Sequence, residues 1–150
     1  MRVVEGGCSC GAVRFRVQGE PRFVSYCHCE NCRRAHGAGA VEWAGYEQAS
    51  MQLLEQSEAA LARWQTPTGA TRRFCRNCGS PLFFGAPRWP GEVHVAVAAL
   101  DADPGKLPGV RVYADRAPAW LPVPQDGLPH LGGEDGVSPL RNSARGISEL

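Results

Sequence analysis

The stretch YCHCENCRR, residues 26–34, holds three of the chain's seven cysteines within six positions. A strand that runs into a short helical loop can direct Cys27, Cys29 and Cys32 at one point, so a single ion could bind all three. Thiolate is a soft ligand that selects zinc, Cu(I) or iron–sulfur clusters over magnesium or calcium. Three protein ligands on a tetrahedral ion leave a fourth position for water or substrate, as in catalytic zinc sites.

The other four cysteines form two pairs. Cys8 and Cys10 have the spacing C-x-C, whereas Cys75 and Cys78 form a C-x2-C pair followed by Gly79, which is a zinc-knuckle spacing. Neither pair alone can complete a tetrahedral site, but the two together can. The cysteines therefore divide into four for a closed, structural site and three for an open one. A structural zinc between the pairs would close a long loop and link folding to zinc loading.

Two interpretations of the three-cysteine cluster remain open at this point. In the first, the fourth coordination position is free and the site is catalytic. In the second, His36 or His28 supplies a fourth ligand and closes the site, and the C-x3-H spacing from Cys32 to His36 is sterically reasonable. In an extended chain the side chain of His28 points away from its neighbours Cys27 and Cys29. We therefore expect His28 to support or pack against the site.

Length and composition indicate one soluble globular domain. The chain has 150 residues, of which 43% are hydrophobic and 21% are charged, and its net charge is +1. This near-neutral balance argues against nucleic acid or a membrane surface as a partner. We expect a cytoplasmic protein, because the sequence shows neither an apolar leader nor a long apolar run. Thiols stay reduced in that compartment, so clustered cysteines indicate metal ligands or catalytic groups.

The pattern of short apolar runs separated by glycine and proline predicts a mainly β fold. The clearest strand is expected over residues 92–100, where valines alternate and His94 is predicted at the surface on the opposite face. Residues 30–35 are expected to form one or two helical turns that end at Gly37. A helix across residues 51–64 is the alternative to two strands there. Further strands are expected at residues 11–17, 22–27, 38–46, 51–56, 61–66, 71–74, 82–84 and 110–113.

The domain is expected to span residues 1–130. From residue 131 the composition turns to glycine, serine and charged residues with few large apolar side chains. Residues 131–150 are therefore predicted to form a flexible C-terminal tail.

The cysteine motifs together resemble the glutathione-dependent formaldehyde-activating enzyme family, which includes centromere protein V. The resemblance covers about residues 3–130, and all seven cysteines stand at family spacing. The segments that carry it are GCSCGAV at residues 7–13, CHCENCRR at 27–34, FCRNCG at 74–79, YADRAPAW at 113–120 and DGLP at 126–129.

This resemblance implies a β-tent fold of mostly antiparallel strands with two zinc ions per chain. It assigns the structural ion to Cys8, Cys10, Cys75 and Cys78. It assigns the second ion to Cys27, Cys29 and Cys32, with the free position accepting the thiol of glutathione. The implied activity is that of a carbon–sulfur lyase that makes or breaks S-hydroxymethylglutathione.

Small-molecule partners follow from that activity, namely a thiol such as glutathione and an aldehyde. Arg33 and Arg34 are candidates to bind the carboxylates of a tripeptide thiol, because guanidinium pairs well with carboxylate. Two rival functions are a zinc-stabilised module that binds protein or nucleic acid without catalysis, and a redox sensor whose thiolates oxidise and release metal. The sequence predicts no particular oligomeric state.

Overall fold

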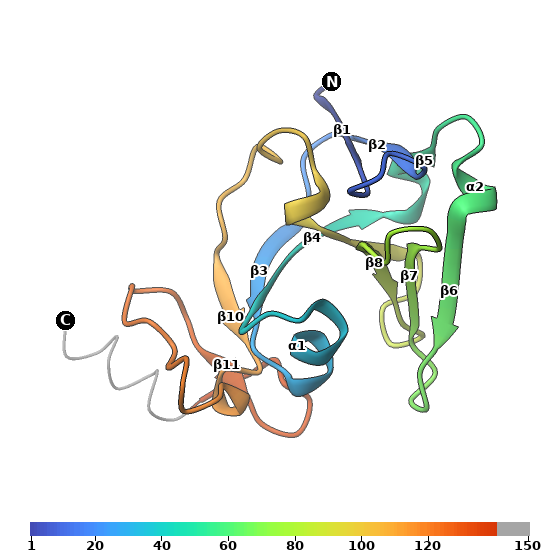
Figure 1. Ribbon diagram of the computed structural model, residues 1–150. Coiled ribbons are helices and arrows are strands. Elements are labelled where there is room, and N and C mark those ends of the chain that lie inside the picture. Colours follow the sequence, from blue (N-terminus) through green and yellow to red (C-terminus); the bar gives the residue numbers. More distant parts are fainter. Residues whose placement is uncertain (141–150) are drawn as a thin grey trace. The chain divides into compact units, whose positions relative to one another are not determined.

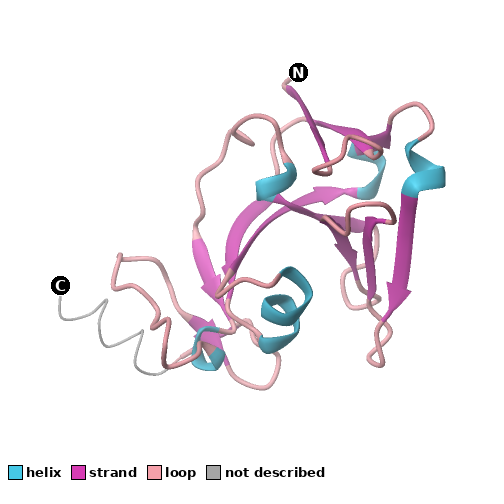
Figure 2. Ribbon diagram, in the orientation of Figure 1, coloured by secondary structure: helices cyan, strands magenta, loops and turns pink. Residues whose placement is uncertain are grey.

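Short strands make up most of the regular structure, and the predicted mainly β class is confirmed (Figure 2). The computed structural model describes residues 1–140 (Figure 1). The chain divides into two units. The first unit consists of residues 1–23 and 43–107, and the second begins with residues 24–42 and resumes at residue 108. Each cysteine cluster predicted from the sequence falls within one unit.

The first unit contains two antiparallel sheets. One has the strand order β1-β2-β5, and the other contains the run β4-β9-β8-β7-β6. Phe15 and Phe83 pack edge to face in the core of this unit, with ring centroids 4.8 Å apart. The elements are β1 (Val3–Gly7), β2 (Arg14–Gln18), β4 (Val41–Glu47), η1 (Gln48–Ser50), β5 (Met51–Leu53), α2 (Ser57–Ala60), β6 (Leu61–Gln65), β7 (Thr71–Cys75), β8 (Pro81–Gly85), β9 (Glu92–Ala96) and η2 (Val97–Ala99).

The second unit carries a parallel strand pair and a short helix. Strand β10 runs parallel to β3, with Val110 opposite Ser25 and Val112 opposite Cys27. This pairing departs from the antiparallel pattern of the first unit. The elements are β3 (Phe23–Cys27), α1 (Glu30–His36), β10 (Val110–Val112), η3 (Ala114–Arg116), β11 (Leu131–Gly132) and β12 (Ser138–Pro139).

Helix α1 begins and ends where the sequence predicted. The Cys29 side chain is the N-cap and accepts the backbone N–H of Cys32 at 3.3 Å. The helix ends at Gly37, which has a φ of 61° and donates its N–H to the Arg33 carbonyl. Glycine suits this position because it lacks the Cβ atom that makes the left-handed backbone conformation unfavourable for other residues. The helix therefore starts within the three-cysteine motif and holds its last two cysteines in a fixed local geometry.

The surface position predicted for His94 is wrong. Strand β9 pairs with β4 on one edge and β8 on the other, so it lies inside its sheet. His94 is buried, and its ring packs against Phe23, Phe84 and Trp89. Its Nε2 atom lies 3.0 Å from Glu92 Oε2. Alternation placed His94 correctly opposite the valines, but both faces of this central strand are covered.

Two further segments refine the sequence predictions. The connection at residues 57–60 is the short helix α2, and the alternative helix across residues 51–64 does not form. Within the predicted tail, β11 and β12 pair in antiparallel fashion. Residues 141–150 lie outside the described residues, and the flexibility of the tail stays a prediction. Among the described residues, no helix has the length and apolar character needed to span a bilayer.

Candidate metal centres

The first unit brings together the two cysteine pairs predicted to share an ion. The Sγ atoms of Cys8, Cys10, Cys75 and Cys78 all lie within 4.8 Å of one another. Cys10 Sγ is 3.7 Å from Cys8 Sγ and 3.7 Å from Cys75 Sγ. Zinc–sulfur bonds of about 2.3 Å in a tetrahedron separate the sulfurs by roughly 3.8 Å. The four sulfurs therefore fit a closed tetrahedral site, and the cluster could hold a metal ion.

The local backbone explains why these sulfurs converge. Strand β7 ends at Cys75, and a tight turn returns the chain through Gly79, whose φ of 77° suits glycine. Cys75 Sγ accepts the backbone N–H groups of Asn77 and Cys78 at 3.4 and 3.5 Å. Cys8 Sγ accepts the N–H of Val13 at 3.2 Å. Although burial opposes it, the hydrogen bond from Val13 helps to lower the pKa of Cys8 and so favours the thiolate form that binds metal.

Ser80 links the two cysteine loops independently of any ion. Its hydroxyl lies 3.2 Å from Cys78 Sγ and 3.1 Å from the Ser9 hydroxyl, and it accepts the Ser9 N–H at 3.0 Å. Hydrogen bonds from the Ser80 hydroxyl and backbone lower the pKa of Cys78 to about 5. One thiolate of the cluster is therefore already ionised at neutral pH.

The second unit contains the three-cysteine cluster. The Sγ atoms of Cys27, Cys29 and Cys32 lie within 4.8 Å of one another. Cys27 ends strand β3, Cys29 caps helix α1, and Cys32 lies in the first turn of that helix. Cys27 and Cys32 are buried, whereas Cys29 is partly exposed. These three sulfurs could hold a metal ion, and in the described chain no histidine belongs to the group.

Crowding of the three thiols changes their ionisation. Hydrogen bonds with Cys29 and Cys32, followed by burial, raise the pKa of Cys27 above the ordinary value for a thiol. A bound cation reverses this effect, because it stabilises several thiolates at once. The donor set and its spacing therefore fit a soft divalent ion such as zinc.

His28 points toward a buried arginine. Its Nε2 atom lies 3.2 Å from Arg111 Nη1, and its backbone N–H donates to the Val112 carbonyl at 3.1 Å. A guanidinium has only donors, so Nε2 accepts and the ring proton sits on Nδ1. Burial and the charge of Arg111 lower the pKa of His28 to about 4. His28 is therefore neutral at physiological pH and braces the loop between Cys27 and Cys29.

Arg111 and Asp126 help to hold His28 and the cysteine loop in place, and the sequence analysis did not predict a role in the site for either residue. Arg111 is 6% exposed, and its guanidinium lies 4.2 Å from the centre of the Tyr26 ring. It also donates from Nη2 to Asp126 Oδ2 at 2.7 Å. The signal that could have found Arg111 is a single charge between two valines in the expected strand 110–113. The hydrogen bonds from Arg111 lower the pKa of Asp126.

The remaining candidates lie on α1. Arg33 donates to the backbone carbonyls of His28 and Arg116, both at 3.3 Å. Arg34 pairs with Glu30 at 2.7 Å on the exposed face of the helix. His36 lies in the last turn of α1, outside the three-cysteine group. Binding of substrate carboxylates by Arg33 and Arg34 stays a prediction. Some of the N–H groups of Arg33 already donate to these backbone carbonyls, one of which belongs to the cysteine loop.

Comparisons with known proteins agree with the cysteine pattern. The family model described as "Glutathione-dependent formaldehyde-activating enzyme" matches residues 3–116. A Halomonas elongata protein named "Putative glutathione-dependent formaldehyde-activating enzyme" is 33% identical over 129 residues, which cover 81% of each chain. An uncharacterized lyase of Schizosaccharomyces pombe is 30% identical over 80 residues, covering 53% of this chain and 56% of its own.

A solved structure shows a similar fold. The crystal structure of a Rhodobacter sphaeroides protein, a structural genomics target, matches with a TM-score of 0.56 and 31% sequence identity. The match covers 69% of this chain and 97% of that one. The family model spans both cysteine clusters and most of the chain. The protein is therefore a member of the glutathione-dependent formaldehyde-activating enzyme family.

Proposed function

We propose that the protein is a zinc-dependent carbon–sulfur lyase that acts on adducts of a thiol with an aldehyde, with S-hydroxymethylglutathione as the model substrate. The observation that carries this proposal is the uneven division of the cysteines. Four sulfurs meet in one unit and three in the other, and no described histidine completes the smaller group. A tetrahedral ion on three sulfurs keeps a position for a substrate atom.

In this proposal Cys27, Cys29 and Cys32 hold the second ion, and Cys8, Cys10, Cys75 and Cys78 hold the structural one. Zinc, when bound, lowers the pKa of a coordinated thiol and so supplies a thiolate near neutral pH. The neutral His28, held by Arg111, keeps the cysteine loop in place without adding a positive charge. Arg33 and Arg34 are proposed to attract the carboxylates of the thiol substrate.

The proposed reaction is balanced without a redox step. In the direction of synthesis, the sulfur of the thiol bonds to the aldehyde carbon, and the carbonyl oxygen gains the proton that the thiol loses. In the direction of cleavage, the carbon–sulfur bond breaks and the sulfur leaves as thiolate while the hydroxyl proton is lost. A reducing compartment keeps the cysteines available, so a cytoplasmic location is part of the proposal.

The test is exchange of isotope-labelled formaldehyde between its free form and S-hydroxymethylglutathione, followed by NMR above the uncatalysed background. The zinc-loaded protein is expected to accelerate exchange, and Cys29→Ala to abolish the acceleration. Arg16→Gln serves as the control, because Arg16 lies on β2 and pairs with Glu5. Exchange at the background rate in the zinc-loaded protein would refute the lyase proposal. Loss of thiols and metal under mild peroxide without exchange would favour the redox sensor instead.

A further inference from the structure

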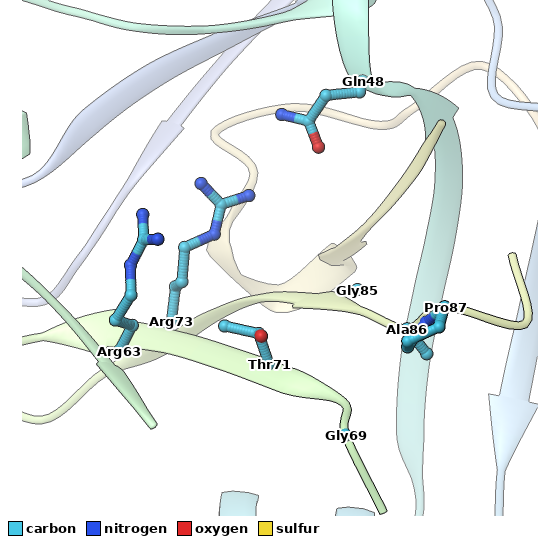
Figure 3. A pocket seen from close by; sticks show the side chains of 8 residues that line it. All are labelled: Gln48, Arg63, Gly69, Thr71, Arg73, Gly85, Ala86 and Pro87. Atoms are coloured by element: carbon cyan, nitrogen blue, oxygen red, sulfur yellow. The ribbon is translucent and has the colours of Figure 1, made fainter. Parts of the chain in front are cut away.

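Two arginines stand side by side on neighbouring strands of the first unit, outside its group of four cysteines. Arg63 on β6 is directly opposite Arg73 on β7 in the antiparallel register. Figure 3 shows both side chains extending in the same direction from neighbouring strands, with their guanidinium groups adjacent. Like charges at directly opposed positions of a β ladder are destabilising. The pairing therefore favours the presence of an anion between them.

No carboxylate within residues 1–140 forms an ion pair with either guanidinium. Most other arginines of the strands are paired, as Arg14 is with Asp101 and Arg16 is with Glu5. Arg73 is partly buried over the Phe83 ring, with its guanidinium carbon 4.9 Å from the ring centre. An anionic ligand between the two guanidinium groups would offset the repulsion between Arg63 and Arg73.

The two arginines line a cavity of about 370 Å³. This volume suits a small ligand rather than a polymer chain. Thr71 lies beside Arg73 on β7, and Gln48 faces the two arginines across the cavity (Figure 3). Their hydroxyl and carboxamide groups add neutral hydrogen-bond donors to the two charged forks. Gly69 and Gly85 line the cavity without side chains that would fill it.

We infer that this cavity binds the phosphate group of a small molecule, with Arg63 and Arg73 as its charged ligands and Thr71 and Gln48 as additional donors. A phosphate monoester carries nearly two negative charges at neutral pH and presents three acceptor oxygens. Two planar guanidinium forks match this charge and this number of oxygens better than they match a single carboxylate. All these ligands belong to the first unit, so the inference is independent of the proposed lyase chemistry.

The experiment is a titration of the zinc-loaded protein with inorganic phosphate and with glycerol 3-phosphate, followed by phosphorus NMR at constant ionic strength. Saturable binding is expected. Arg63→Gln and Arg73→Gln are each expected to weaken it about tenfold or more, because each removes charge-assisted hydrogen bonds. Arg73→Lys keeps the charge but loses the fork, so it is expected to bind with intermediate affinity. Arg16→Gln, with the same change in net charge, is the matched control.

Each result of this titration either supports or overturns the inferred phosphate site. Wild-type zinc content and circular dichroism in the arginine variants establish that they fold. If Arg16→Gln weakens phosphate binding as much as Arg63→Gln and Arg73→Gln do, the effect is one of nonspecific charge and the inference is overturned. Binding of succinate with no binding of either phosphate probe would also overturn it, because the site would then recognise carboxylates. None of these results depends on lyase activity.

Discussion

Arg111 Nη1 lies 3.2 Å from His28 Nε2, and this contact joins two positions that are 83 residues apart in sequence. His28 stands between two cysteines of the three-cysteine cluster, and Arg111 stands on the strand that pairs with β3. The same guanidinium also binds Asp126 and stacks on Tyr26. The cysteine loop is therefore held by a buried cation as well as by the metal that we propose.

Replacement of Arg111 by methionine is expected to destabilise the protein by about 1–3 kcal/mol, because it removes hydrogen bonds to His28 and Asp126 and leaves polar groups unpaired. The free energy of unfolding in denaturant, at a fixed concentration of free zinc, measures this effect. Zinc affinity of the three-cysteine site is expected to fall as well. Arg34→Met is the control, because Arg34 is exposed and its loss is expected to cost less than about 0.5 kcal/mol. Equal stability of the two variants would contradict the bracing role.

Asp126 is expected to make stability depend on acidity. Its folded-state pKa is lowered by Arg111, so its contribution is present above the unfolded-state pKa of about 3.9 and is lost as pH falls through the folded value. Asp126→Asn lacks this contribution. The stability difference between wild type and Asp126→Asn is therefore expected to shrink as pH falls from about 5 to about 3. Taking the difference cancels the effect of acid on the zinc ligands that both proteins share. A difference that does not change with pH would exclude a stabilising ion pair.

Substitution of Gly37 tests how the left-handed backbone at the end of α1 affects stability. Alanine there is expected to cost about 1–2 kcal/mol, because the left-handed backbone strains any residue with a Cβ atom. A Cβ at Gly37 meets nothing within 4 Å, so strain alone decides the result. Gly109 is the matched control: a Cβ there also meets nothing within 4 Å, and its φ lies outside the left-handed region. Thermal unfolding of Gly37→Ala and Gly109→Ala should therefore differ, and equal melting temperatures would refute the strain argument.

Cys75→Ala is expected to unfold most of the first unit, because it removes a buried ligand from the four-cysteine cluster. Circular dichroism is expected to show loss of strand signal, and zinc content is expected to fall. Ser80→Ala serves for comparison, because it removes only hydrogen bonds to Cys78 and Ser9 and is expected to cost about 1 kcal/mol. A Cys75→Ala protein as stable as Ser80→Ala would mean that no structural ion is held there.

Local patterns predicted much of the fold. Alternation predicted a strand over residues 92–100, of which residues 92–96 form β9 and residues 97–99 form the 3-10 helix η2. The turn and capping residues predicted α1 with its end at Gly37. Strand β1 was missed, because its two glycines at residues 6 and 7 disguise the alternation. The surface position predicted for His94 was wrong, because alternation indicates which face of a strand a residue lies on but not what covers that face.

The candidate sites also contain some residues that the sequence predicted and others that it missed. Spacing and thiolate chemistry predicted the two groups of cysteines, since each pair or triplet is local in sequence. Arg111 and Asp126 were missed because their role depends on a parallel strand pairing that brings residue 111 beside residue 26. The pair of Arg63 and Arg73 likewise exists only through the register of β6 with β7. Long-range register carries no signal in a local window of sequence.

The uneven division of the seven cysteines is tested most directly by native mass spectrometry of the purified protein. Two zinc ions per chain are expected in the wild type, and one is expected in a folded Cys29→Ala variant that keeps the four-cysteine ion. A single zinc ion per wild-type chain, or two ions retained by Cys29→Ala, would contradict a three-sulfur site with an open position.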